Sequence, residues 1–77
     1  MRVRSVLEVG AAARDRREHL GWSQQALADQ AGVTREWVVR FEGGKPTVRL
    51  DRVFDVITAL GLVVELEERA DTGAERR

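Results

Sequence analysis

Apolar residues recur over residues 6–60 at spacings of three and four, the pattern of helices that bury one face. The stretch "SVLE" at residues 5–8 has the S-x-x-E form of a capping box. In that motif the serine oxygen accepts a hydrogen bond from the backbone N–H of Glu8, and the glutamate side chain reaches back. This stretch predicts a first helix over residues 6–20, which Gly21 would end.

A short second helix and a tight link follow. Ser23 is placed to cap a helix over residues 24–30, and Gly32 would stop it. The apolar side of this helix consists of Leu27, Ala28 and Ala31. The link to the next helix is the short stretch Ala31-Gly32-Val33.

A third helix, capped by Thr34 and ended by the glycine pair at 43–44, has two unlike faces. On a 3.6-residue period Val38 and Phe41 fall together, with Trp37 beside them. The other face carries Arg35, Glu36, Val39 and Arg40. One face packs, so the other is free to contact a partner. Trp37 has two interpretations, since it can pack beside Phe41 or lean from the helix edge on a bound partner.

The last helix and a strand complete the pattern. An apolar stripe predicts a fourth helix over residues 50–60, closed by Gly61; its members are Leu50, Val53, Phe54, Ile57 and Leu60. The following "LVVEL", residues 62–66, favours a β-strand. A single strand needs a partner, either the alternating start of the chain at residues 2–5 or the same segment of a second subunit, which we favour. The residues expected in this dimer contact are Leu62, Val63, Val64 and Leu66.

Composition fits one small domain. The chain has 77 residues and no cysteine, and its 13 basic residues balance 13 acidic ones. Residues 1–64 hold ten Lys/Arg against eight Asp/Glu, whereas residues 65–77 hold three against five. A mildly basic body therefore carries a mildly acidic tail, and a dimer would add stability that so small a core lacks.

Several kinds of chemistry find no support in the sequence. The only histidine, His19, has no cluster of ligands at metal spacing, so no metal site is expected. Asp51 and Asp55 lie one helical turn apart, but no nucleophile or electrophilic group accompanies them. "GGK" at residues 43–45 lacks the surroundings of a phosphate-binding P-loop. We expect no cofactor, no enzymatic activity, no membrane span and a cytoplasmic, nucleoid-associated protein.

Two short helices joined by a glycine-containing link, the second with a polar outer face, are typical of a helix-turn-helix. An α-helix fits the major groove of DNA, where arginine can bond two atoms of guanine. The N-termini of the second and third helices would offer N–H groups and partial positive charge to phosphates.

The stretch "RREHLGWSQQALADQAGVTREWVVRFEGGKPT" resembles the DNA-binding domain of the phage-repressor or xenobiotic-response-element family, over about residues 6–60. Within that family, "REWVVRFEGGKPTVRL" followed by "VFDVITALGLVVEL" is similar to the HipB-type antitoxins. The resemblance implies an all-α, lambda-repressor-like bundle of four to five helices with a short C-terminal dimerising β-strand. The expected parts are a DNA-binding domain at 1–61, a dimerisation strand at 62–66 and a flexible polar tail at 67–77.

The resemblance also implies roles for individual residues. Gln24 and Thr34 match positions that hold phosphates. The positions that face base edges are Arg35, Glu36, Val39 and Arg40, with Val39 placed against a thymine methyl. Lys45 follows the third helix, which would enter the major groove as the recognition helix, and loops after such a helix approach the DNA backbone. Arg17 and Glu42 match a structural ion pair between the first and third helices.

Plainer interpretations stand beside these. Arg35, Glu36 and Arg40 can form an ordinary solvated face, with an ion pair between Glu36 and Arg40 at i,i+4. The arginines of "ARDRRE", residues 13–18, can form a stripe that faces phosphate, but we favour a solvated helix surface because Asp15 and Glu18 interleave with them. The tail can simply aid solubility, or it can be exposed to proteases or order on a partner.

Together the motifs and the resemblance predict a dimeric repressor of its own operon that binds a pseudo-palindromic double-stranded DNA operator. The resemblance further implies the antitoxin of a HipBA-like type II pair, with a HipA-like kinase toxin as partner. The alternatives are an autonomous repressor with no toxin and a protein-interaction adaptor on the same fold.

Overall fold

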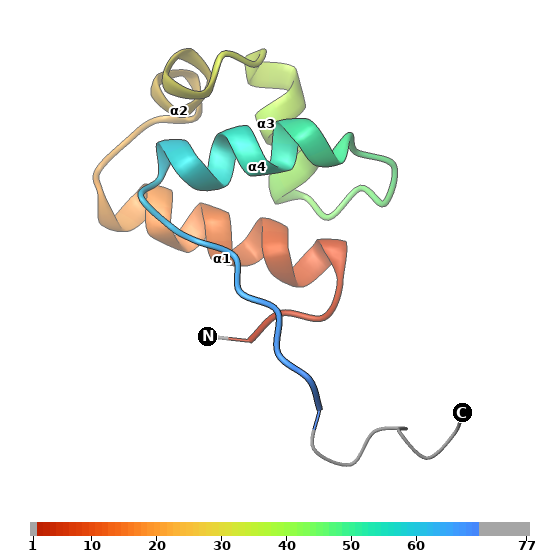
Figure 1. Cartoon of the computed structure of the whole chain (residues 1–77). Helices are drawn as coiled ribbons and strands as arrows, with labels where there is room; N and C mark the ends of the chain where they lie inside the picture. The colour runs from red at the N-terminus through yellow and green to blue at the C-terminus, as the bar shows by residue number, and fades with distance from the viewer. Residues whose placement is uncertain (1, 70–77) are drawn as a thin grey trace.

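The computed structural model describes residues 2–69, in which four helices form. They are α1 (Val6–His19), α2 (Gln24–Ala31), α3 (Arg35–Glu42) and α4 (Leu50–Ala59). The predicted all-α class is confirmed, and each helix begins and ends within one residue of its predicted bounds. α3 packs against both α1 and α2, and α4 packs against α2 (Figure 1). Of the expected tail at 67–77, residues 70–77 lie outside the described part of the chain.

Three helices begin with the side-chain caps that the sequence predicts. The side-chain oxygens of Ser5, Ser23 and Thr34 each accept a hydrogen bond from the backbone N–H three residues later, at 3.0–3.1 Å. Glu8 completes the first cap by accepting from the backbone N–H of Arg4. Caps of this kind stabilise a helix by about 0.5–2 kcal/mol each, so they fix where α1, α2 and α3 start.

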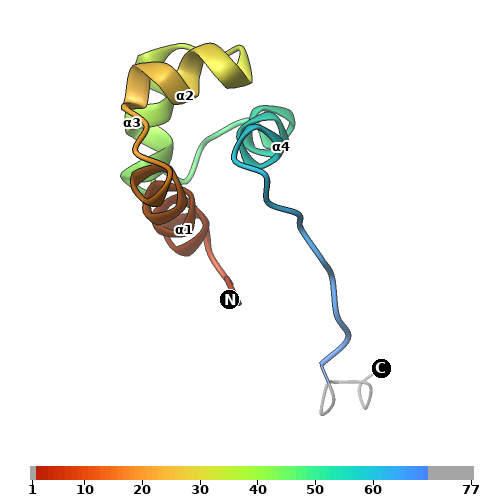
Figure 2. The same cartoon turned by 90° about the vertical axis from the view of Figure 1, so that its left-hand side faces the viewer.

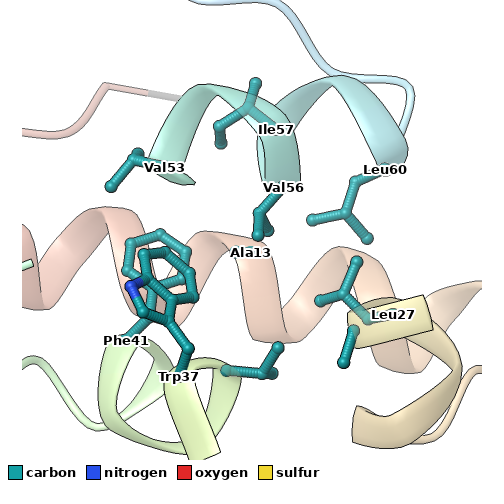
Figure 3. Close-up of a cluster of buried hydrophobic side chains, with 10 residues drawn as sticks. Ala13, Leu27, Trp37, Phe41, Val53, Val56, Ile57 and Leu60 are labelled. Carbon is teal, nitrogen blue, oxygen red and sulfur yellow. The ribbon is translucent and has the colours of Figure 1, made fainter. Parts of the chain in front are cut away.

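The core lies where the four helices meet (Figure 3). Its largest fully buried side chains are Phe41, Leu27, Leu60, Val38 and Val56. Trp37 is only 9% exposed, and its ring centroid lies 5.0 Å from that of Phe41. Of the two interpretations for Trp37, the structure therefore supports the core one. Both aromatic rings come from α3, so the buried face of this helix fixes its orientation in the bundle.

α1 and α3 cross at very close range beside Gly10. A Cβ atom added to Gly10 would lie 2.1 Å from the backbone oxygen of Phe41, a distance at which atoms overlap. Gly44 has a left-handed φ of 83°, and a Cβ there would lie 2.6 Å from Cδ1 of Leu7. Two glycines thus allow α1 to pack directly on α3 and on the turn after it.

The apolar stripe of α4 is only partly buried, which corrects the sequence prediction. Val53, Ile57 and Leu60 lie in the core as expected, but Leu50 is 67% exposed and Phe54 is 44% exposed. Val56, which was not in the predicted stripe, is fully buried. The buried positions follow an i, i+3, i+4, i+7 pattern from Val53, a narrower face than the whole apolar stripe. Leu50 and Phe54 lie beyond that face, where the single chain offers nothing to cover them.

No β-strand forms within residues 2–69, so the strand expected at 62–66 is absent from the single chain. The chain after α4 leaves the helices as an extended segment (Figure 2). We call residues 62–69 the C-terminal arm. Its contact with the start of the chain is an ion pair between Arg2 and Glu67 at 3.5 Å, and no backbone hydrogen bonds join the two segments. Extended backbone becomes a strand only when a neighbouring strand takes its hydrogen bonds, and the chain's own N-terminal segment does not do so.

Candidate nucleic-acid interface

The outer face of α3 has the character that the sequence predicts for a reading surface. Trp37, Val38, Phe41 and Glu42 are buried, whereas Arg35, Glu36, Val39 and Arg40 are exposed. Val39 keeps 43% of its surface in solvent. Within the described residues no ion pair joins Glu36 to Arg40, so these charged groups are not engaged with each other as the plainer interpretation suggested.

A hydrogen-bonded network behind this face joins three helices. Arg17 of α1 donates from Nε to Glu42 Oε2 at 2.6 Å and from Nη2 to Glu42 Oε1 at 3.0 Å. Its Nη1 also donates to the backbone oxygen of Trp22 at 2.8 Å, which anchors the loop before α2. Gln24 Nε2 donates to Glu42 Oε1 at 3.1 Å. The network therefore fixes the start of α2 against the C-terminal end of α3.

Ion pairing and burial act on the Arg17 guanidinium in opposite directions. The hydrogen bond to Glu42 raises the pKa of Arg17 above its ordinary value, against the opposing effect of burial. The Arg17 and Glu42 side chains are only 10% and 3% exposed. A two-point ion pair with a further hydrogen bond from Arg17 to the Trp22 backbone oxygen can offset the cost of taking both charges out of water, so the pair is structural.

A groove of about 570 Å³ opens between α1, the start of α2 and the outer face of α3. It is lined by Arg14, Arg17, Ser23, Gln24, Gln25, Arg35, Val39, Glu42 and Gly43. Arg17 pairs with Glu42, and Arg14 pairs with the exposed Glu18 at 3.2 Å, so Arg35 carries the remaining positive charge on the walls. The groove is concave, polar and positively charged, as a surface for a phosphate chain should be.

Gln24 and Thr34 keep hydrogen-bond donors for an outside group. One amide hydrogen of Gln24 is used by Glu42, and an NH₂ group carries a second. Thr34 Oγ1 accepts from the backbone N–H of Trp37 at 3.0 Å, which leaves its own O–H free to donate. Both side chains stand at helix N-termini, where the first N–H groups and the helix dipole favour an anion.

The groove brings together only some of the residues predicted to contact DNA. Gln24, Arg35 and Val39 line it, together with the ion pair of Arg17 and Glu42. Thr34, Glu36, Arg40 and Lys45 are exposed but do not line it. Lys45 lies in the turn after α3, and its backbone N–H donates to the Arg40 oxygen at 3.1 Å.

Four groove residues were not among the predicted site residues: Arg14, Ser23, Gln25 and Gly43. Ser23 was recognised only as a cap, although it adjoins the predicted phosphate contact Gln24. Gln25 donates to Asp29 at 2.9 Å along α2. Arg14 lies one helical turn before Arg17, and that i,i+3 spacing was the available signal that it faces the same side of α1.

Over residues 2–69, His, Cys, Asp and Glu side chains form no group of three that could hold a metal ion. In the same part of the chain, no helix is both long enough and apolar enough to cross a membrane.

Comparisons with known proteins agree with this geometry. A family model described as a helix-turn-helix domain matches residues 8–70. The chain belongs to this helix-turn-helix family. It is also similar to an uncharacterized HTH-type transcriptional regulator, y4mF, of Sinorhizobium fredii, with 32% identity over 65 residues that cover 84% of this chain and 86% of that protein.

Solved structures show the same fold. A chain of a HipA–HipB–O2–O3 complex has a TM-score of 0.82 with this helix-turn-helix protein at 24% identity, covering 88% of this chain and 96% of that one. A HipB–O4 20mer complex gives the same values. The expected lambda-repressor-like, HipB-type architecture is thus confirmed. The family is one of DNA-binding regulators rather than enzymes, and the chain is accordingly a helix-turn-helix regulator and not an enzyme.

Within the helix-turn-helix, α2 and α3 are the two motif helices. Gly32 ends α2 with a left-handed φ of 73°, and the link to α3 runs through Val33 to the cap Thr34. α2 extends one residue beyond its predicted end, so the link begins at Gly32 rather than at Ala31. α3 is the second helix of the motif, and its first residue, Arg35, lines the groove.

Proposed function

We propose that this helix-turn-helix regulator is a sequence-specific transcriptional repressor that inserts α3 into the major groove of double-stranded DNA. The observation that carries the proposal is the positively charged groove beside the exposed face of α3, with Arg35 and Val39 on its wall. A concave basic surface next to a protruding helix fits a DNA strand in the groove and base edges against the helix.

Each contact has a distinct role in this proposal. Arg35 and Arg40 donate to guanine, Glu36 accepts from the cytosine amino group and Val39 meets a thymine methyl, at about 1–3 kcal/mol of discrimination per good pair. Gln24 and Thr34 donate to phosphates flanking the recognition helix, and Lys45 adds a phosphate contact beyond its C-terminal end. Arg14, from the wall of the groove, joins this phosphate-binding set.

We further propose that the protein acts as a homodimer on a pseudo-palindromic operator. The C-terminal arm supports this proposal, because Val63, Val64 and Leu66 are 81%, 50% and 94% exposed and no part of the described chain pairs with them. Two arms related by a twofold axis could satisfy each other's backbone and cover these side chains. Two recognition helices would then face successive major grooves, about 10–10.5 base pairs apart.

The finer proposal is that this repressor is the autoregulating antitoxin of a type II toxin–antitoxin pair, with a HipA-like kinase as toxin. Two observations support this proposal: the sequence resembles the HipB-type antitoxins, and one solved structure that shares the fold is named as a HipA–HipB complex. The alternative functions are an autonomous repressor and a protein-interaction adaptor. An adaptor would not need the positive charge of the groove.

DNA binding can be tested by fluorescence anisotropy with duplexes selected from a random pool. Arg35→Ala and Arg40→Ala should each lower affinity for the selected duplex about 5- to 150-fold, the range that corresponds to 1–3 kcal/mol. Arg52→Ala removes the same charge from α4, at a side chain that pairs with Asp55 and lines neither groove, so it is the matched control. Unchanged affinity and sequence preference in both α3 variants, with folding intact, would show that this face does not read DNA.

The toxin proposal is tested by purifying the tagged protein from its native host and measuring the mass of the intact particle. Two chains of 8.7 kDa give a dimer of 17.4 kDa. A stoichiometric second protein with kinase activity would identify the chain as an antitoxin. Recovery of the 17.4 kDa species alone, under conditions that preserve complexes, would instead support the autonomous repressor.

A further inference from the structure

Large apolar side chains that remain exposed are concentrated away from the recognition face. Eight are exposed within residues 2–69, and only Val39 belongs to α3. The others come from the two ends of the described chain, the first turn of α1 and α4: Val3, Leu7, Leu50, Phe54, Val63, Val64 and Leu66. A domain of this size rarely leaves so many apolar side chains uncovered without a partner for them.

Four of these side chains belong to a second groove or its neighbourhood. This apolar groove, of about 360 Å³, is lined by Val3, Arg4, Ser5, Val6, Val9, Phe41, Pro46, Val48, Leu50 and Val53. Val3 and Leu50 lie at its exposed margin, 41% and 67% accessible. Phe54 lies one helical turn beyond Leu50 on α4, and Leu7 lies beside the N-terminal wall. The surface is therefore mostly aliphatic, with Arg4 as its one charged lining residue.

The C-terminal arm has the chemistry that this groove would accept. In an extended chain Leu62, Val64 and Leu66 point to the same side. Leu62 is half-buried against the core, but Val64 and especially Leu66 project into solvent. Acidic residues, Glu65, Glu67 and Glu68, accompany them. The arm is thus an apolar edge with negative charge, opposite in sign to the Arg4 side chain of the groove.

The chain's own arm comes near this groove without filling it. Glu67 lies 3.5 Å from Arg2, which immediately precedes the groove residue Val3. Nevertheless Leu66 is 94% exposed, and Leu50 remains 67% exposed. The acidic arm can therefore pair with the basic N-terminal segment, but the apolar side chains of the arm and of the groove remain uncovered in the single chain.

We infer that the apolar groove of each chain is occupied by the C-terminal arm of a second copy, in a reciprocal exchange about a twofold axis. Leu66 of one copy lies over Leu50 of the other, and the arm's glutamates lie near Arg2 and Arg4. This inference rests on the proposed homodimer and deepens it, because it adds an arm-to-groove contact to the arm-to-arm pairing. The twofold axis makes each arm enter the groove of the other chain, so one interface covers the exposed apolar side chains of both the arms and the grooves.

The absence of cysteine from the sequence allows a clean cross-linking test on the full-length protein. Two populations with different affinity tags carry Leu50→Cys and Leu66→Cys respectively, and they are mixed, allowed to exchange and mildly oxidised. A disulfide forms only when the two Cα atoms approach within about 7 Å. We expect a covalent species that carries both tags. Val39→Cys mixed with Leu66→Cys is the matched control and should give no such species, since Val39 is also exposed but lies on α3.

Other outcomes overturn the inference and separate it from the proposed dimer. Dimers that link only Leu66→Cys to Leu66→Cys, or do not link at all, would show that the arms do not enter the grooves. A monomeric Leu50→Cys/Leu66→Cys double variant that closes an internal disulfide would show that the chain's own arm fills its groove. A protein that sediments as a monomer at all concentrations would remove the proposed dimer itself.

A second measurement does not depend on disulfide chemistry. Leu50→Asp places a charge at the margin of the groove and should weaken dimerisation at least about tenfold, since a leucine contact is lost and a carboxylate would face the acidic arm. Val39→Asp introduces the same charge on α3 and should leave the dimer dissociation constant unchanged. Equal dissociation constants for both variants, with native helical content, would contradict the arm-to-groove contact.

Discussion

Arg17 and Glu42 face each other as a two-point ion pair across the α1–α3 contact, with Nε 2.6 Å from Oε2 and Nη2 3.0 Å from Oε1. The pair is nearly inaccessible, and Gln24 adds a third hydrogen bond to the same carboxylate. The same carboxylate thus connects the interior of the bundle to the first residue of α2. Through Gln24, the network also reaches the groove that we assign to a DNA phosphate.

Removing one member of this pair should be strongly destabilising. Arg17→Ala leaves Glu42 buried without its counter-charge, and we expect a loss of about 3–5 kcal/mol in the free energy of unfolding. The measurement is urea denaturation followed by circular dichroism. The double variant Arg17→Met/Glu42→Leu removes both charges and should recover most of the loss, because apolar pairs of similar volume often replace buried ion pairs without penalty. A double variant as unstable as the single one would show that the other hydrogen bonds of the network dominate.

Gly10→Ala is a test in which two physical effects predict opposite signs. Helix propensity alone would make alanine more stable than glycine by about 0.8–1.0 kcal/mol. The added Cβ, however, would lie 2.1 Å from the Phe41 backbone oxygen, and α1 and α3 would have to separate. We expect a net destabilisation of about 1–3 kcal/mol, as for other overpacked sites. Ala11→Gly, at an exposed position one residue later, measures the propensity effect by itself; a stabilised Gly10→Ala protein would contradict the close crossing.

The three arginines of "ARDRR" show how far the sequence carries the prediction. Caps and apolar spacing located all four helices, because those signals are local. The arginines look alike locally but have three environments: Arg14 pairs with Glu18, Arg16 donates from Nε to the Leu60 oxygen at 3.0 Å, and Arg17 is buried with Glu42. The Arg16 and Arg17 partners are 44 and 25 residues away in the sequence. Only the family resemblance pointed to Glu42, and nothing in the sequence pointed to Leu60.

Arg16 should therefore matter for stability although it resembles a surface residue in sequence. It caps the C-terminal end of α4, where carbonyl groups lack helical partners and the dipole favours a cation. Arg16→Ala should lower the free energy of unfolding by about 1.5–3 kcal/mol, the range for hydrogen bonds to charged groups. Arg14→Ala, which breaks an exposed ion pair, should change it by less than about 0.5 kcal/mol. Equal effects of the two substitutions in thermal unfolding would mean that the Leu60 contact does not stabilise the bundle.

Phe41 lies in the core, whereas Phe54 lies on the surface that we assign to a second copy. Phe41 is fully buried, so Phe41→Ala should cost about 3–5 kcal/mol at any protein concentration. Phe54 is 44% exposed in the single chain, and Phe54→Ala should have a much smaller effect on the monomer. If the exposed face of α4 is covered in the dimer, the Phe54→Ala difference should grow as the protein concentration rises above the dimer dissociation constant. Chemical denaturation at two concentrations, one on each side of that constant, measures this difference.

Gln24 and Arg14 represent an uncharged and a charged phosphate contact, and the salt dependence of DNA binding should distinguish them. Both line the groove, but only arginine can displace a condensed counterion from DNA. Arg14→Ala should therefore reduce the slope of log affinity against log salt concentration by about 0.9 per lost phosphate contact. Gln24→Ala should weaken selected and random duplexes by the same factor while it leaves that slope unchanged, because a phosphate contact carries no sequence information. Salt titrations of the wild type and both variants measure these slopes and affinities. An unchanged slope for Arg14→Ala would show that Arg14 does not contact a phosphate. If Gln24→Ala lowered affinity for the selected duplex but not for random duplexes, Gln24 would contact a base edge instead of a phosphate.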